Sequence, residues 1–160
     1  KDGAQALVPA ALIIGAARGI VYLMGGDDPE TPSLLNTLLF FGSESLGGLP
    51  GWFASWLMLA GQSVFNFFVT SGSGQAALTM PIMAPLSDLI GVTRQVAVLA
   101  FQLGDGLTNI VVPTSAVLMG ALGAARLNWL VWVRATAPFF AGLALLASLF
   151  VIAASLAGFS

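Results

Sequence analysis

Long apolar stretches, separated by short polar segments rich in glycine and proline, make up most of this chain. No Asp, Glu, Lys or Arg lies between Glu44 and Asp88, between Asp105 and Arg126, or after Arg134. A membrane-spanning helix needs about 20 mostly apolar residues, so these intervals leave room for several spans. The pattern predicts an all-α membrane protein with helices at about 5–24, 33–46, 52–69, 75–90, 94–103, 110–122 and 129–157.

Two apolar runs are interrupted by polar residues without any long hydrophilic loop. The helices predicted at 52–69 and 75–90 are joined only by a short segment of Thr, Ser and Gly. Bare backbone at membrane depth survives only where protein or a water-filled cavity surrounds it, so this pattern is typical of a re-entrant helical hairpin. The helices on either side of 104–109 are each too short to span a membrane. Together they predict one broken transmembrane helix.

The two interruptions share one spacing. Gly72-Ser-Gly and Gly104-Asp-Gly are each separated from a following proline by six residues, giving G-x-G-x6-P twice, 32 residues apart. Glycine tolerates the backbone angles that let a helix stop abruptly. A helix that restarts offers free N–H groups to an anion, and one that has just ended offers carbonyls to a cation. Many secondary transporters build their sites this way, although such glycines can also serve close helix packing.

The candidate site residues lie at these two interruptions. Asn66 belongs with them because a polar amide in an apolar helix needs a partner. We expect substrate binding by Asn66, Ser71, Gly72, Ser73, Gly74, Gln75, Thr108, Asn109, Thr114 and Ser115. We expect cation or proton coupling at Gly104, Asp105 and Gly106, with a Na⁺ ion possible near Asp105 and Asn109.

Asp105 is the most informative single residue. A carboxylate at the centre of a bilayer costs about 2.5 kcal/mol or more, so it is usually retained for function. It could bind a cation, carry a proton or pair with a substrate ammonium. The alternative is a structural one, in which Asp105 is the N-cap of a helix that restarts near Leu107.

Several other polar residues have a structural interpretation. Thr31 or Ser33, and Thr93, can act as N-caps of the helices that follow them. Asp88, near the end of a hairpin arm, is expected at the interface, and Arg94, beside a turn, in water. At the start of the last helix, Trp129, Trp132 and Arg134 have the pattern of an interfacial belt.

Composition excludes several classes of function. Hydrophobic residues make up 58% of the chain and charged residues only 8%, against about 25% charged in a soluble domain. The net charge of −2 gives no reason to expect a nucleic-acid partner. Cys and His are absent, which removes disulfides, thiolate or imidazole metal sites and histidine-based catalysis. We therefore expect no enzyme, and no cofactor beyond Na⁺ or H⁺ as coupling ion.

Two short motifs partly resemble the signatures of intramembrane proteases. Gly104-Asp105 is part of an aspartyl G-x-G-D signature, but position 102 is Gln102 and no second well-placed Asp follows. Ser71 lies near a serine-type motif, but no His is present to act as its base. We set this class aside.

The sequence also resembles a known family. The resemblance is carried by Ile14–Ile20 and, more specifically, by Ser71–Leu86, Gly91–Gln95, Gln102–Asn109 and Pro113–Ser115. These segments resemble the C-terminal half of YfcC-type carriers, which belong with the DcuC four-carbon dicarboxylate carriers and are more distantly similar to AbgT transporters. The resemblance implies two inverted repeats in a homodimer, each repeat with a re-entrant hairpin and a broken helix. It implies a hairpin tip at Ser71, Gly72, Ser73 and Gln75 and a broken-helix loop at Asp105, Thr108 and Asn109.

The chains of that family are considerably longer than this one, so we expect this chain to supply one repeat. The N-terminal half of the same transporter, or a second copy, would complete the site. We expect a secondary active transporter of a bacterial inner membrane that crosses the bilayer several times. It would move a small carboxylate or amino acid, coupled to a cation or by exchange. The alternative, favoured by the short length, is a structural or assembly subunit of a membrane complex.

Overall fold

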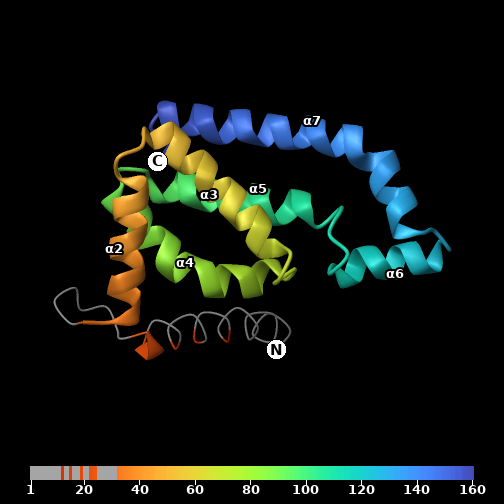
Figure 1. The fold of residues 1–160 in the computed structure, drawn as a ribbon, viewed down its shortest axis with the longest axis horizontal. Helices are drawn as coiled ribbons and strands as arrows, with labels where there is room; N and C mark the ends of the chain where they lie inside the picture. The colour runs from red at the N-terminus through yellow and green to blue at the C-terminus, as the bar shows by residue number, and fades with distance from the viewer. Residues whose placement is uncertain (1–11, 13–14, 16–18, 20–21, 25–31) are drawn as a thin grey trace, which may run out of the picture.

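The computed structural model describes residues 32–160 and positions 12, 15, 19 and 22–24, and the expected helix at 5–24 lies largely outside these residues. Within the described residues the fold is all-helical (Figure 1). The helices are α2 (Leu34–Leu46), α3 (Gly51–Asn66), α4 (Gly72–Leu89), α5 (Arg94–Thr108), α6 (Ala116–Ala124) and α7 (Trp129–Leu156). We call segment 67–71, between α3 and α4, the tip, and segment 109–115, between α5 and α6, the break.

Most of these helices begin at a polar side chain that accepts a hydrogen bond from the first turn. Such an N-cap satisfies one of the backbone N–H groups that have no partner inside the helix. The prediction that Thr93 caps its helix is confirmed, and Ser33 rather than Thr31 caps α2. The capping residues are Ser33 for α2, Ser71 for α4, Thr93 for α5, Ser115 for α6 and Asn128 for α7.

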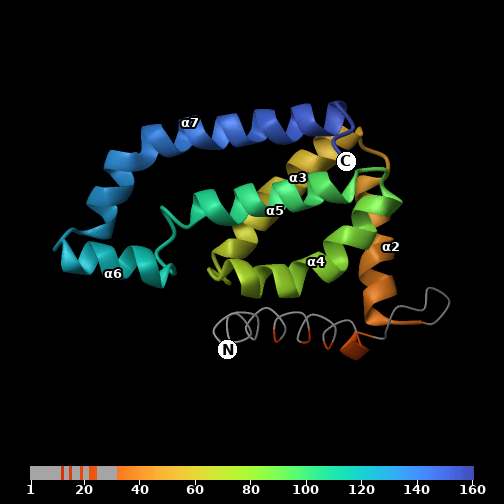
Figure 2. The same ribbon diagram turned by 180° about the vertical axis from the view of Figure 1, so that it is seen from behind.

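Helix α5 occupies the centre of the molecule. It packs against α3, α4 and α7, while α3 also packs against α7 and α2 against α4 (Figures 1 and 2). The core between these helices is built from small or slender side chains, among them Ala54, Met58, Val96, Ala97 and Ala100. Small side chains let helix backbones approach closely, which is how helices associate where lipid provides no hydrophobic driving force.

Helices α3 and α5 approach each other closely at Gly104. A Cβ atom placed on this glycine would lie 2.9 Å from Cβ of Gln62 and 3.0 Å from the backbone N of Ser63. Only glycine fits there without displacing α3. Gly104 therefore sits inside a continuous helix and serves packing between α3 and α5.

The break lies further along the chain than the sequence predicted. We expected the helix to stop at 103 and to resume at 110, but α5 continues through Gly104 and Gly106 to Thr108, and α6 begins only at Ala116. The cause is Pro113, which has no N–H to donate and whose ring clashes with the carbonyl of the residue four positions earlier. A proline also disfavours helical angles in the residue before it. The two glycines therefore lie inside the helix, and the proline lies in the segment that follows its end.

The two helices expected to form hairpin arms also differ from their expected bounds. The first arm was expected to reach 69 and the second to begin at 75, whereas α3 ends at Asn66 and α4 begins at Gly72. Gly72 and Gly74 therefore form the first turn of α4. The two arms diverge away from the tip, and α5 packs against both of them (Figure 1).

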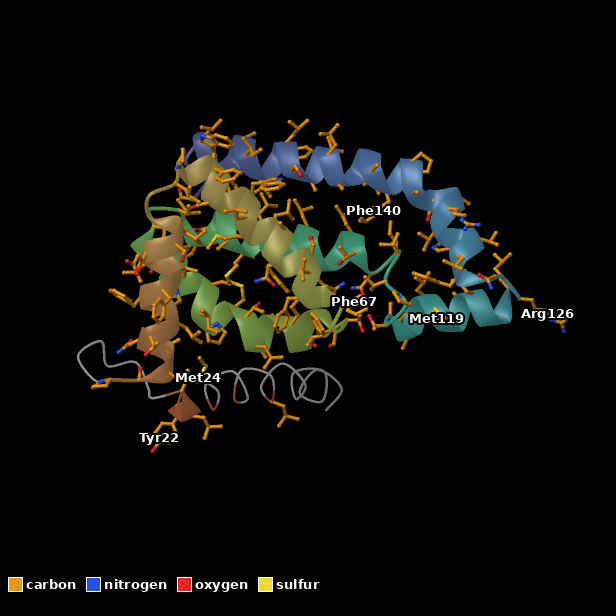
Figure 3. All side chains as sticks on the ribbon, viewed as in Figure 1. Tyr22, Met24, Phe67, Met119, Arg126 and Phe140 are labelled. Carbon is orange, nitrogen blue, oxygen red and sulfur yellow. The ribbon has the colours of Figure 1, made fainter. Side chains whose placement is uncertain are left out.

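The outer surfaces are strongly apolar. Large hydrophobic side chains are exposed on α2 and α7, including Phe40, Phe41, Phe139 and Phe150. Side chains project outward along both helices (Figure 3). Helix α7 is, among the described residues, the helix long and apolar enough to cross a membrane, with a mean hydropathy of 2.4 in its best window. Exposed apolar area of this kind suits lipid or another hydrophobic surface.

Candidate functional site

The tip and the break lie against each other in space. Thr70 Oγ1 donates a hydrogen bond of 3.3 Å to the carbonyl of Thr114. A Cβ atom placed on Gly72 would lie only 2.6 Å from Oδ2 of Asp105. The structure therefore brings together the two interruptions that share the G-x-G-x6-P spacing, although they are 32 residues apart in the sequence.

Asp105 is held between two helix ends. It lies in the last turn of α5, where the helix dipole disfavours an anion. Its Oδ2 lies against Gly72 in the first turn of α4, where the dipole favours one. Its Oδ1 accepts a hydrogen bond of 2.9 Å from the amide of Asn109. Within the described residues no Lys or Arg forms an ion pair with this carboxylate.

The structural interpretation of Asp105 as an N-cap is wrong. The residue belongs to the C-terminal turn of α5, and the helix that restarts after the break is capped by Ser115. Ser115 is buried, and its Oγ accepts from the backbone N of Leu118 at 3.4 Å. Asp105 is therefore free of a capping role.

Asn66, the last residue of α3, is hydrogen-bonded to the last turn of α5. It is fully buried, and its Nδ2 donates to Oγ1 of Thr108 at 2.7 Å and to the carbonyl of Asp105 at 3.3 Å. The hydroxyl of Thr108 in turn donates to the carbonyl of Gly104. The partner that a buried amide needs is therefore supplied by the residues just before the break.

Gln75 forms the corresponding link at the tip. Its side chain is fully buried, and its Nε2 donates to Oε1 of Gln62 at 2.7 Å and to the Gln62 carbonyl at 3.0 Å. This contact ties the first turn of α4 to α3. Sequence reasoning missed Gln62, although it lies four residues before Asn66 and hence on the same helix face.

Three buried amide oxygens of the candidate residues accept no hydrogen bond from the described protein. They are Oδ1 of Asn66, Oε1 of Gln75 and Oδ1 of Asn109. Leaving a buried acceptor unpaired costs about 1–3 kcal/mol, so such atoms are uncommon in folded proteins. Asn66 and Asn109 both donate to Asp105, to its carbonyl and its carboxylate respectively. The region around Asp105 is therefore rich in acceptors and suited to a donor or a cation.

A cavity of about 430 Å³ opens beside the break. It is bounded by the tip, the break, α6 and α7. Its lining residues are Thr70, Asn109, Ile110, Ser115, Val117, Leu118, Ala121 and Trp132. None of them is charged, and two of the expected site residues, Asn109 and Ser115, are among them.

The other expected site residues do not line the cavity, and several of them are exposed. Ser71 and Ser73 are exposed, and the Ser71 hydroxyl is used to cap α4 by accepting from the backbone N of Gly74 at 3.3 Å. Gly106 is exposed, with nothing within 4 Å of an added Cβ. Thr114 is exposed and contributes its carbonyl to the contact with the tip.

The two tryptophans at the start of α7 have a role beyond an interfacial belt. Their indole N–H groups donate to backbone carbonyls of the break, Trp129 to Val111 and Trp132 to Ile110, each at 2.9 Å. Arg134 is exposed and makes no such contact. Sequence reasoning could not link Trp129 or Trp132 to these carbonyls, because a carbonyl group carries no residue signature.

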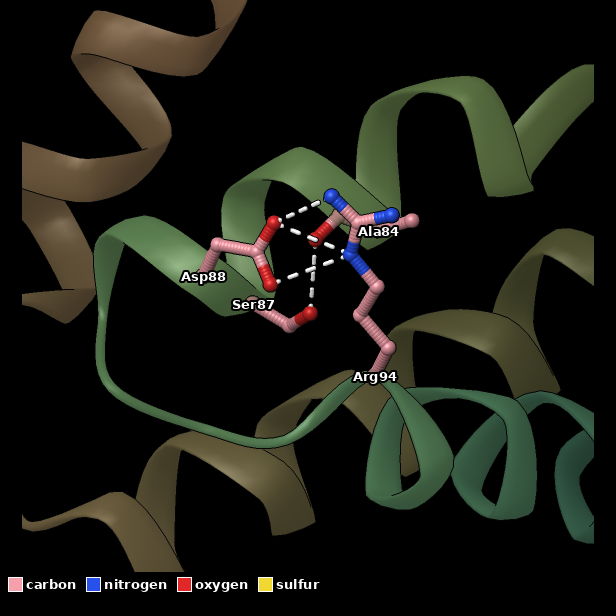
Figure 4. A network of polar contacts seen from close by, with 4 residues as sticks. All are labelled: Ala84, Ser87, Asp88 and Arg94. Atoms are coloured by element: carbon pink, nitrogen blue, oxygen red, sulfur yellow. Dashed lines mark hydrogen bonds and ion pairs between the residues drawn. The ribbon is translucent and has the colours of Figure 1, made fainter. Parts of the chain in front are cut away.

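An ion pair joins α4 to α5 at the opposite end of α4 from the tip. Arg94 Nε donates to Oδ1 and Oδ2 of Asp88 at 3.1 and 2.9 Å (Figure 4). Both side chains are exposed, at 47% for Asp88 and 63% for Arg94. Their expected positions, at the membrane interface and in water, stay predictions. The hydrogen bonds from Arg94 lower the pKa of Asp88.

The long apolar helix, the exposed apolar faces and a buried polar region where helix ends meet are typical of part of a helical membrane protein. The family model described as "DcuC: C4-dicarboxylate anaerobic carrier" matches residues 1–156. The chain therefore belongs to the DcuC family.

Individual relatives support this membership. The chain is 49% identical over 158 residues to the "Putative basic amino acid antiporter YfcC" of Escherichia coli K12, covering 99% of this chain and 31% of that protein. It is 34% identical over 154 residues to an uncharacterized protein of Haemophilus influenzae, covering 94% and 28%. The chain thus spans about a third of the length of these curated relatives.

A solved structure shares the fold. The crystal structure of the YdaH transporter from Alcanivorax borkumensis matches with a TM-score of 0.68 at 23% identity. The match covers 76% of this chain and 27% of that transporter. At this identity the likeness concerns the fold alone.

Proposed function

We propose that this chain forms one part of a secondary active transporter and contributes its cation-binding side. The observation that carries the proposal is Asp105, a carboxylate without a basic partner in the described residues, at the meeting point of two helix ends. Asn109 donates to this carboxylate and Asn66 to the backbone carbonyl of Asp105, and each of these two amides has an oxygen without a hydrogen-bond partner in the described residues. The cation would be a substrate ammonium or a coupling ion.

The chemistry of the site favours an amino acid over a substrate that carries only carboxylates. Asp105 and the unpaired amide oxygens are all acceptors, so they would repel a carboxylate and attract an ammonium. The family model is described as a dicarboxylate carrier, whereas the E. coli relative is named as a basic amino acid antiporter. The acceptor-rich site agrees better with the second description.

The substrate carboxylate would bind at the start of α6. This helix begins beside the cavity, and Ser115 and Leu118 from its first turn line that cavity. Free N–H groups and the positive end of the helix dipole at such a position attract an anion. One amino acid could then bridge α6 and Asp105, with its uncharged portion in the cavity.

Coupling would take place at Asp105 and Asn109. Their oxygens could hold a Na⁺ ion, Asp105 could carry a proton, or a second substrate could take the same position in an exchange cycle. Discontinuous helices serve substrates and coupling ions together in many such carriers. The remainder of the site would come from the N-terminal half of the transporter or from a second copy in a homodimer within the inner membrane.

The proposal is tested with the full-length transporter in proteoliposomes. Uptake of arginine, ornithine, neutral amino acids and succinate is measured with a Na⁺ gradient, with a pH gradient, and after preloading with unlabelled substrate. The substitution Asp105→Asn keeps the size of the side chain and removes its charge. Loss of a charge-assisted hydrogen bond worth about 1.5–3 kcal/mol should lower uptake about 10- to 100-fold.

The matched control is Asp88→Asn, which neutralises the exposed carboxylate at the other end of α4. It should transport like the parent. If Asp105→Asn were as active as Asp88→Asn, Asp105 would have no part in binding or coupling and the proposal would fall.

A further inference from the structure

The break leaves backbone carbonyls without helical partners. In a continuous helix the carbonyls of Ile110 and Val111 would accept from the N–H groups four residues later. Pro113 interrupts that ladder, and the N–H of Ser115 donates to the carbonyl of Val112 instead. An unpaired carbonyl in a membrane interior costs several kcal/mol, so the two carbonyls need other donors.

The first turn of α7 supplies these donors. Trp132 Nε1 donates to the carbonyl of Ile110 and Trp129 Nε1 to that of Val111, both at 2.9 Å, and both contacts are partly buried. The two tryptophans are three residues apart and therefore lie on the same face of α7. An indole N–H can only donate, so this indole pair (Trp129 and Trp132) matches two acceptors that follow one another in the chain.

Few other contacts hold this part of the molecule. Helix α6 packs extensively against no other helix of the described residues, and it projects away from the main body (Figure 1). The break is anchored on one side by the hydrogen bond from Thr70 and on the other by the indole pair. The indole contacts are the shorter ones.

The anchored carbonyls lie next to the candidate site. Ile110 directly follows Asn109, whose amide donates to the carboxylate of Asp105. Asn109, Ile110 and Trp132 all line the 430 Å³ cavity. A shift of the break would therefore move an Asp105 partner and one wall of the cavity together.

We infer that Trp129 and Trp132 are positioning residues, which fix the break by donating to its free carbonyls and so hold Asn109 in place for transport. The effect on transport rests on the proposed function, whereas the anchoring of the break by the two indoles does not depend on it. The role is specific to the indole N–H. Phenylalanine keeps an aromatic ring and loses the donor.

The experiment uses the full-length transporter with the double substitution Trp129→Phe/Trp132→Phe. The control is Trp56→Phe in α3. It removes an indole hydrogen bond of 3.2 Å to Ser148, which lies on α7 away from the break. Hydrogen–deuterium exchange of peptides covering 109–115 is measured by mass spectrometry, together with thermal stability and the kinetics of substrate uptake.

The double variant should show faster exchange in 109–115 and unchanged exchange in α3. The KM of the double variant for uptake should rise about fivefold for each lost indole hydrogen bond. In Trp56→Phe, both the exchange rate in 109–115 and the KM should stay at the parent values. Equal exchange in the double variant and the parent would overturn the anchoring. Faster exchange with an unchanged KM would overturn the positioning role. A parent that transports none of the substrates would refute the proposed function, and the exchange result would still decide the anchoring.

Discussion

The G-x-G-x6-P spacing occurs once next to the tip, within α4, and once next to the break, from the end of α5 to Pro113. In the first case the glycines form the first turn of α4, and Pro81 lies inside a helix that continues to Leu89. In the second case the glycines lie near the end of α5, and Pro113 lies within the break itself. The same spacing therefore yields a helix that starts in one place and a helix that stops in the other.

This difference gives the two regions complementary electrostatics. The start of α4 carries the positive end of a helix dipole and the end of α5 the negative end. Asp105 belongs to the second but lies against Gly72 of the first. The positive end of α4 is therefore partly used by the protein's own carboxylate, which leaves the start of α6 as the freer position for a substrate anion.

The largest expected change in stability comes from replacing Gly104 by alanine, with Gly106 as the matched control. In Gly104→Ala the new Cβ would lie 2.9 Å from Gln62 and 3.0 Å from the backbone of Ser63. Overpacking of this kind costs about 1–3 kcal/mol, and the melting temperature of the full-length protein should fall. The control, Gly106→Ala, meets nothing within 4 Å and should be neutral or stabilising by up to about 1 kcal/mol. Equal melting temperatures for the two variants would refute the packing role.

A smaller effect distinguishes how the tip is held. Replacing Gln62 by Leu removes the side-chain acceptor of the Gln75 amide and leaves it only the backbone carbonyl at position 62. The loss of one hydrogen bond should cost about 0.5–1.5 kcal/mol, measured by thermal unfolding. The double variant Gln62→Leu/Gln75→Leu removes both partners and should recover most of this loss, because an apolar pair needs no hydrogen bond. Failure of the second substitution to restore stability would show that the amide pair does not act as a unit.

The smallest expected effect lies outside both regions, at Asp88 and Arg94. Because the folded pKa of Asp88 lies below its ordinary value of 3.8, the pair stabilises the folded state above that value and loses its contribution as the pH falls through the folded pKa. The difference in melting temperature between the parent and Arg94→Gln should be small at pH 7 and should shrink as the pH falls below 3.8. For Arg134→Gln, which removes an exposed arginine without an ion pair in the described residues, no such pH dependence is expected.

Much of the helical arrangement follows from the sequence, and the misplaced details have physical causes. Apolar runs and capping residues such as Thr93 indicate helices directly. Gly104 was mistaken for a helix breaker because its need to be small arises from α3, which is far away in the sequence. Gln62 and the indole pair were missed as parts of the site for the same reason, since their partners lie 13 to 22 residues away.

The central claim, that the tip and the break form one site, is tested most directly by cross-linking. This chain has no cysteine, so Thr70→Cys/Thr114→Cys can be introduced into a full-length transporter whose other cysteines have been replaced. Thr70 Oγ1 lies 3.3 Å from the Thr114 carbonyl, so thiols at these two positions can approach each other with small side-chain and backbone adjustments, as disulfide formation requires. The control pair, Asp88→Cys/Thr114→Cys, uses a residue near the other end of α4, about 25 Å along the helix from the tip. We expect oxidation to link the first pair rapidly and the control pair negligibly. Equal cross-linking of both pairs, or of neither, would contradict the account.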